Sequence, residues 1–94
     1  MSGEKYTEKW FNLNDALHQL MVITMEECGE LTQACSKAIR KKKFYDFDQL
    51  KDEIGDVYTM ICLLQKFDIV SWEELENRKN VKEEKLKKWS NLIE

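Results

Sequence analysis

The scarcity of residues that break helices constrains this chain more than any other feature. Its 94 residues include no proline and only three glycines. Both residue types commonly end helices and strands, so a chain with so few of them favours long helices. Apolar residues recur at spacings of three and four, while strand-like alternation and glycine-rich loops are absent from the sequence. These patterns predict an all-α fold.

Helical periodicity divides the chain into four segments. A short amphipathic segment covers residues 7–11, and an asparagine-rich cap precedes a long helix that ends near the basic run Arg40-Lys41-Lys42-Lys43. Asp46 and Gln49 resemble a capping box for the next helix, and Ser71-Trp72-Glu73-Glu74 is a capping box for the last one. We expect a four-helix-bundle-like fold with a long central antiparallel pair of helices, shorter flanking helices, and completion by oligomerisation.

Size and composition exclude several classes of protein. The length fits a single domain over residues 1–94, and a net charge of -3 argues against binding of nucleic-acid polymers. No apolar run is long enough for a membrane span, and no signal peptide is evident. The three cysteines (Cys28, Cys35 and Cys62) are expected to be reduced, buried and small apolar residues, which indicates a cytoplasmic location.

Two acidic clusters repeat one pattern at an offset of 26 residues. Glu26-Glu27-Cys28-Gly29-Glu30 and Asp52-Glu53-Ile54-Gly55-Asp56 each hold two acids, an apolar residue, a glycine and a third acid. Each cluster places two carboxylates at i and i+3, on one side of a helix. Both clusters lie nine to eleven residues from the expected turn near residues 41–45, or about 14–16 Å along a helix. In an antiparallel hairpin the two clusters therefore meet.

These acids have two interpretations. Most glutamate-rich helix segments are simply solvated surfaces. Here, however, the acids fall within the apolar rows, and no lysine or arginine occurs between Lys9 and Lys37. Facing carboxylates in a bundle require either raised pKa values or a bound cation, and oxygen ligands without nearby histidine or cysteine chemistry suit Mg²⁺ or Mn²⁺. Gly29 and Gly55 could permit close helix packing or leave room for a ligand, and the sequence does not separate these two roles.

The double motif resembles a known family. Glu26-Glu27-x-x-Glu30, followed after 22 residues by Glu53-x-x-Asp56, is similar to the EExxE…ExxD motif of the MazG-like all-α nucleoside triphosphate pyrophosphohydrolases. The resemblance covers about residues 13–89. It implies Mg²⁺-dependent hydrolysis of NTPs, dNTPs or related nucleotides to the monophosphate and pyrophosphate by a metal-activated water.

The resemblance also implies roles for individual residues. The metal ligands would be Glu27, Glu30, Glu53 and Asp56. Glu26 matches the first acid of the motif and completes the catalytic set, at the edge of the cluster, where it could orient or deprotonate a water or support the ligands.

Other residues are candidates for holding the substrate. Arg78, Lys79 and Lys82, and secondarily the basic turn at residues 41–43, could hold phosphates, although each could equally be solvated surface charge. Trp10 and Phe11 could stack on a base and His18 could hydrogen-bond to one. Core or interface roles compete for the two aromatics, and a surface or interface role for His18.

Three functions remain open at this point. The first is the pyrophosphohydrolase, and the second is a non-catalytic helical nucleotide-binding or interaction module that retains the acidic face. The third is a purely structural helical oligomer. The chain carries three tryptophans and four phenylalanines, which is more apolar surface than a small bundle easily covers, so we expect a homodimer or a dimer of dimers. The presence of all five motif acids favours the enzyme.

Overall fold

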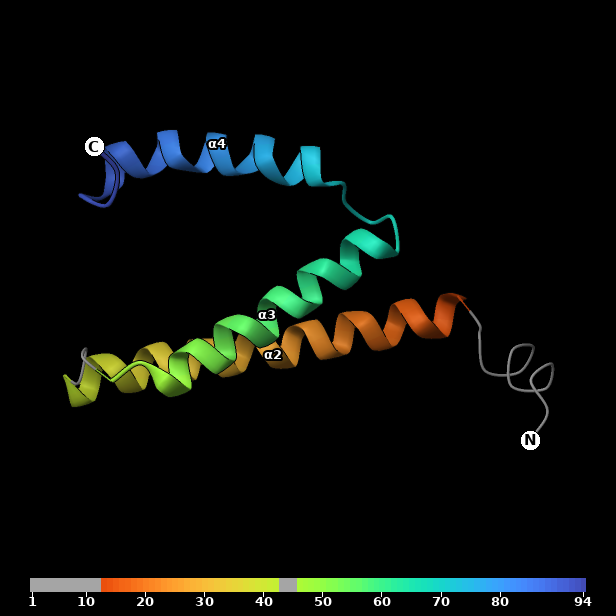
Figure 1. Ribbon diagram of the computed structural model, residues 1–94, viewed down its shortest axis with the longest axis horizontal. Coiled ribbons are helices and arrows are strands. Elements are labelled where there is room, and N and C mark those ends of the chain that lie inside the picture. The colour runs from red at the N-terminus through yellow and green to blue at the C-terminus, as the bar shows by residue number, and fades with distance from the viewer. Residues whose placement is uncertain (1–12, 43–45) are drawn as a thin grey trace. The chain divides into compact units, whose positions relative to one another are not determined.

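The described part of the chain is entirely helical apart from turns and short connections. The computed structural model describes residues 13–42 and 46–94. Its three helices are α2 (Leu13–Lys41), α3 (Asp48–Lys66) and α4 (Trp72–Trp89) (Figure 1). No strand occurs in these two ranges, and the all-α prediction is confirmed. The short helical segment predicted over residues 7–11 lies outside the described residues.

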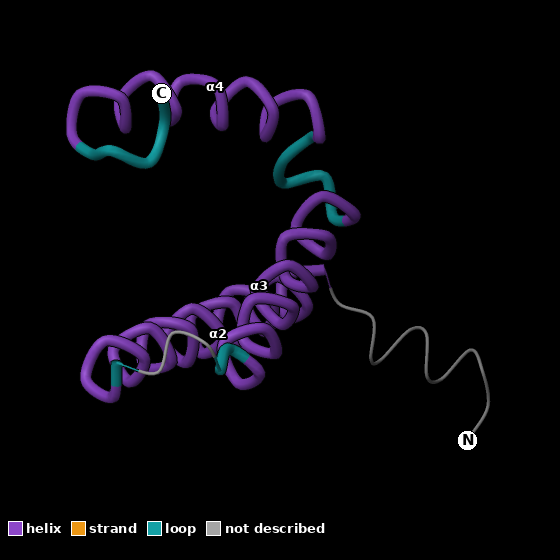
Figure 2. The backbone as a smooth tube through the Cα atoms, turned by 60° about the vertical axis from the view of Figure 1, so that its left-hand side comes forward, coloured by secondary structure: helices purple, strands orange, loops and turns teal. Residues whose placement is uncertain are grey.

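Helices α2 and α3 form an antiparallel hairpin. They run side by side in two views of the backbone (Figures 1 and 2). Within the described residues only Leu20, Ala34 and Met60 are buried, each with 5% of its surface exposed. Leu20 and Ala34 are separated by 14 residues, or two heptads, so they occupy the same side of α2. One row of each helix therefore packs against the other helix.

The ends of the hairpin are defined by local hydrogen bonds. The Lys42 N–H donates to the Ala38 carbonyl at 2.9 Å, and Lys42 adopts the left-handed conformation with φ of 55°. A residue in the left-handed conformation commonly ends a helix and is usually a glycine. For another residue, such as Lys42, this conformation costs about 1 kcal/mol. The predicted Asp46–Gln49 capping box is wrong in detail. Asp46 Oδ1 accepts a hydrogen bond from the Asp48 N–H at 3.4 Å instead, because α3 begins at Asp48.

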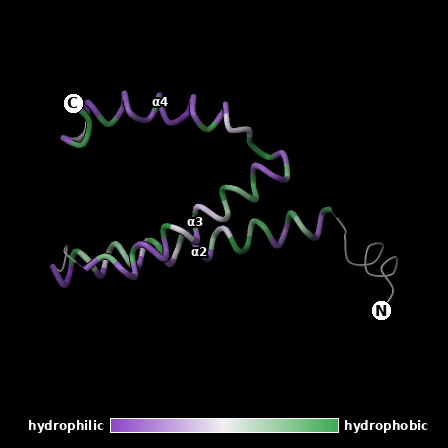
Figure 3. Tube along the Cα trace, viewed as in Figure 1, coloured by the Kyte–Doolittle hydropathy of each residue, from purple (hydrophilic) through white to green (hydrophobic). Residues whose placement is uncertain are grey.

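Helix α4 begins with the predicted capping box. Ser71 Oγ accepts from the Glu74 N–H at 3.0 Å, and Glu74 Oε1 accepts from the Ser71 N–H at 2.8 Å. The helix is far more hydrophilic than α2 and α3 (Figure 3). The chain divides after Leu63 into two compact units, of which the second contains α4. No described helix combines the length and apolar character that crossing a membrane requires.

A second row of α2 is apolar but exposed. Its members follow each other at alternating spacings of four and three residues: Met21, Met25, Cys28, Thr32, Cys35 and Ile39. Met25 and Ile39 each expose 66% of their surface. The expectation that the cysteines are buried is wrong, because the free thiols of Cys28 and Cys35 are exposed and that of Cys62 is half-buried. Cys28 and Cys35 lie on this second row of α2, and α3 covers only the first.

Candidate active site

The hairpin places one carboxylate of each acidic cluster in its packed interface. Glu27 follows Leu20 by seven residues and precedes Ala34 by seven, and Glu53 precedes Met60 by seven. Seven residues are two helical turns, so both glutamates lie on the same rows as the buried residues. Both are half-buried. In an ordinary helical hairpin such packed rows consist of apolar residues. Here each row also contains one carboxylate.

The charges of the two clusters act on each other across the hairpin. Partial burial raises the pKa of Glu27 above its ordinary value of 4.5. Three neighbouring carboxylates raise this pKa further, in decreasing order Glu30, Asp56 and Glu26. The structure therefore brings the acids of α2 within electrostatic range of an acid of α3, as the matched spacing to the turn predicts.

Glu53 is in the same situation from the opposite helix. Partial burial is again the largest cause that raises its pKa above 4.5, followed by the charge of Glu30. A hydrogen bond to the Glu30 carboxylate, which only protonated Glu53 can donate, raises this pKa further. The charges of Asp56 and Glu27 add to the effect. Like charges and lost solvation thus both oppose ionisation at this point.

The remaining acids of the motif line the outside of this pair. Glu26, Glu30 and Asp56 are exposed. The ion pairs that join two described residues of α4 involve no acid of the two clusters. Another polar residue on the packed row is satisfied locally, since Thr24 Oγ1 donates to the Leu20 carbonyl at 2.6 Å. The carboxylates therefore lack the protein cation that normally accompanies half-buried negative charge.

The chemistry of this donor set fits a divalent cation. Four carboxylates, two from each helix, supply hard oxygen ligands of the kind that Mg²⁺ and Mn²⁺ prefer. Nevertheless, no group of three or more Asp, Glu, His or Cys side chains in the described ranges is close enough together to hold an ion as it stands. The side chains would have to rotate toward a common point to coordinate one, and Glu30 and Asp56 are exposed.

The two glycines of the motif are not explained by close helix packing. A Cβ atom built on Gly29 or on Gly55 meets no heavy atom of the described structure within 4 Å. Neither glycine has a positive φ. Close packing between the described helices is therefore not the reason for either glycine.

The first-choice cations for holding phosphates, Arg78, Lys79 and Lys82, are all on α4. In the secondary candidate, the basic turn, Lys41 ends α2 and Lys43 lies outside the described residues. Lys79 Nζ lies 3.6 Å from Glu76 Oε2 and 3.4 Å from Glu83 Oε2. The charge of Glu76 is the largest cause that raises the pKa of Lys79, followed by that of Glu83. Lys79 is thus occupied within its own helix. Arg78 and Lys82 are exposed on the same side of α4, four residues apart, and form no ion pair with the described residues.

The predicted base-binding residues are only partly described. Trp10 and Phe11 lie outside the described residues. His18 is exposed on α2, nine residues before Glu27. The structure does not bring it to the carboxylates.

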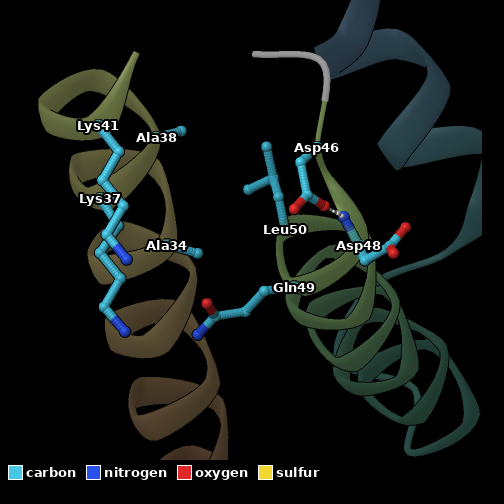
Figure 4. A pocket seen from close by; sticks show the side chains of 8 residues that line it. All are labelled: Ala34, Lys37, Ala38, Lys41, Asp46, Asp48, Gln49 and Leu50. Carbon is cyan, nitrogen blue, oxygen red and sulfur yellow. Dashed lines mark hydrogen bonds between the residues drawn. The ribbon is translucent and has the colours of Figure 1, made fainter. Parts of the chain in front are cut away.

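A cavity of about 330 Å³ lies between α2 and α3, near the loop that joins them (Figure 4). Helix α2 contributes Ala34, Lys37, Ala38 and Lys41 to its walls, and Gln49 faces them from α3. Sequence reasoning did not single out Lys37 or Gln49. The available signal was a common spacing, since Lys37 follows Glu30 by seven residues and Gln49 precedes Asp56 by seven.

The fold and the site define an all-α protein with an anionic site between paired helices. Comparison with family models finds a match to the MazG nucleotide pyrophosphohydrolase domain over residues 15–85. The match covers more than two thirds of the chain and includes both acidic clusters, and the chain belongs to this family. Comparisons with curated proteins and with solved structures gave no significant match.

The raised pKa values of Glu27 and Glu53 predict a specific dependence of stability on pH without metal. A carboxyl group with a raised pKa binds its proton more tightly in the folded state, so folding is favoured below pH 4.5 and loses this contribution as pH rises through the raised pKa. In EDTA at pH 7, Glu27→Gln should therefore melt at a higher temperature than the wild type. The difference should shrink toward zero as the pH falls to 4.5. Thermal melts followed by circular dichroism at a series of pH values measure this, and a variant that melts lower at pH 7 contradicts it.

Proposed function

We propose that this protein hydrolyses nucleoside triphosphates, deoxynucleoside triphosphates or related nucleotides in a reaction that requires Mg²⁺. Water adds to a phosphorus atom, the bond from that phosphorus to a bridging oxygen breaks, and the products are a nucleoside monophosphate and pyrophosphate. Membership of the MazG nucleotide pyrophosphohydrolase domain family supports this reaction class. A cytoplasmic location remains a prediction from the sequence.

One observation carries the proposal. Two half-buried glutamates, one on the packed row of each helix, lie within electrostatic range of Glu30 and Asp56, and no protein cation is paired with any of the four in the described ranges. Such an arrangement costs folding free energy through repulsion and lost solvation. A cost of this kind at a defined point of a packed hairpin is typical of a functional site.

The acids of the two clusters have separate roles in the proposed reaction. Glu27, Glu30, Glu53 and Asp56 would hold Mg²⁺. When bound, Mg²⁺ polarises a phosphoryl group, lowers the pKa of water and offsets charge on the departing pyrophosphate. Without the cation these carboxylates repel an anionic substrate, so they enforce metal dependence. Glu26, an exposed residue that directly precedes Glu27 in the chain, would orient or deprotonate a water.

Product analysis tests this reaction directly. A screen of NTPs and dNTPs with Mg²⁺ should yield the monophosphate and pyrophosphate in equal amounts for the accepted nucleotides. Mn²⁺ should substitute, and EDTA should abolish turnover, because the carboxylates alone disfavour binding of a polyanion. Anion-exchange chromatography of the nucleotides together with separate assays for pyrophosphate and orthophosphate measures the outcome. Release of orthophosphate with a diphosphate product, or full activity in EDTA, excludes the proposal.

The exposed apolar row of α2 supports a second proposal, that the chain assembles as a homodimer or a dimer of dimers. The row extends from Met21 to Ile39 and repeats at alternating spacings of four and three, the pattern by which one helix packs against another. On α3, Ile54 and Tyr58 are also exposed, at 50% and 59% of their surface. Exposed apolar surface of this regularity favours burial against a second copy.

For the phosphates of the substrate, Arg78 and Lys82 are the available cations of α4. Lys79 is the weakest of the three candidates because two glutamates already neutralise it. Exposed ion pairs of this kind are exchangeable, however, so Lys79 stays a candidate.

A further inference from the structure

We propose that the cavity between α2 and α3 is the subsite for the phosphate end of the substrate, with Lys37 and Lys41 as its anion-binding residues. The inference rests on the proposed function and adds a location and an orientation to it. The bound group would be the two terminal phosphates, which leave as pyrophosphate.

The position of the cavity relative to the carboxylates is the first argument. Lys37 follows Glu30 by seven residues along α2, and Gln49 precedes Asp56 by seven along α3. Because the helices are antiparallel, both steps lead from the acidic site toward the loop. Each covers two turns, or about 10 Å at 1.5 Å per residue. Lys37 and Gln49 therefore lie on the same side of their helices as Glu30 and Asp56, about two turns closer to the loop.

The direction of the lysine side chains is the second argument. Side chains of a helix tilt toward its N-terminus, and for Lys37 and Lys41 the N-terminal direction of α2 is the direction of Glu30. Figure 4 shows both ammonium groups extending along α2 toward the level of Ala34 and beyond it. The lysines therefore shorten the gap to the carboxylates, and an extended polyphosphate held at the acidic site would reach them.

The charge state of the cavity is the third argument. Lys37 and Lys41 form no ion pair within the described residues, although Asp46 and Asp48 line the same cavity. The opposing charges are held apart across the space, and Asp46 instead accepts the hydrogen bond from the Asp48 N–H. Two cations four residues apart on one helix, together with the Gln49 amide that points toward α2 (Figure 4), can donate hydrogen bonds to several phosphate oxygens.

The small side chains that line the cavity on α2 explain why space remains between the helices. Ala34 and Ala38 point toward α3 at this level (Figure 4) and are too small to fill the gap between the helices. A volume of about 330 Å³ is roughly ten times that of one water molecule in the liquid. The orientation follows: the phosphates point toward the loop, and the nucleoside extends toward the beginning of α2.

Binding of inorganic pyrophosphate tests the subsite separately from catalysis. Calorimetric titration of the full chain with pyrophosphate in excess Mg²⁺ should show affinity about tenfold lower for Lys37→Gln and for Lys41→Gln than for the wild type, the effect of one lost hydrogen bond to a charged group. Affinity for a nucleoside monophosphate should be unchanged in both variants. Asp48→Asn should bind pyrophosphate more tightly, because it removes an opposing negative charge from the cavity.

The matched control is Lys51→Gln. Lys51 is exposed on α3 of the same hairpin but does not line the cavity, so it measures the general effect of removing one positive charge. Equal pyrophosphate affinity in Lys37→Gln, Lys41→Gln and Lys51→Gln overturns the subsite, as does a wild type that does not bind pyrophosphate. If the wild type hydrolyses triphosphates but the three variants are equal, only the subsite is wrong. If triphosphates are not hydrolysed but the two cavity variants alone lose pyrophosphate, only the proposed reaction is wrong.

Discussion

Glu53→Gln should lose turnover by about a thousandfold while the protein stays folded, a loss of the size that follows removal of one transition-state stabiliser. The substitution keeps the shape of the side chain and removes one negative charge from the packed row of α3. In EDTA the variant should melt no lower than the wild type, because partial burial and the nearby charge of Glu30 already disfavour the ionised form of Glu53. Added Mg²⁺ should raise the melting temperature of the wild type more than that of the variant, since a ligand that binds only the folded state stabilises according to its affinity.

The control for this prediction is Asp52→Asn. Asp52 is an exposed acid of the same cluster, one residue before Glu53, and it is outside the proposed ligand set. It should keep turnover within a few-fold of the wild type and retain the response to Mg²⁺. Specific activity and both melts are measured on the same preparations. If Glu53 has a purely structural role, Glu53→Gln melts lower with or without metal and its activity falls only as far as its folding does.

Ile39→Glu should convert the assembled protein into a monomer. Ile39 exposes 66% of its surface at the end of the exposed apolar row of α2. A charge buried without a partner in an interface costs about 3 kcal/mol or more, which weakens association by more than about a hundredfold. Sedimentation equilibrium at micromolar concentration should give the wild type at least twice the chain mass of 11.3 kDa and the variant close to 11.3 kDa.

Leu92→Glu is the matched control for assembly. Leu92 is also an exposed apolar residue, at 78%, but it lies after α4 and outside the row. The same substitution there should leave the sedimenting mass of the wild type unchanged. A wild type that sediments as a folded, active monomer contradicts the assembly proposal, and equal dissociation by both variants shows that the row is not the interface.

The helices and the meeting of the two acidic clusters were predictable from the sequence. Helical periodicity is a local property, and the capping box at Ser71 depends on four consecutive residues. The clusters meet because each is nearly the same number of residues from one turn, so only the existence of an antiparallel hairpin had to be assumed. The sequence also separates Glu27 and Glu53 from Glu26. The first two lie on apolar rows of their helices, and Glu26 does not.

Only the tertiary structure decided which apolar row of α2 packs against α3 and where a further cavity lies. Periodicity indicates which residues share a side of a helix, but a helix with two apolar rows can turn either one toward its neighbour. In α2 the row of Leu20, Glu27 and Ala34 packs against α3, and the row from Met21 to Ile39 stays exposed. The cavity likewise depends on two alanines facing α3 beside Lys37 and Lys41. Such features follow from the rotation of each helix about its axis and from the register between the helices, which contacts between residues distant in sequence determine.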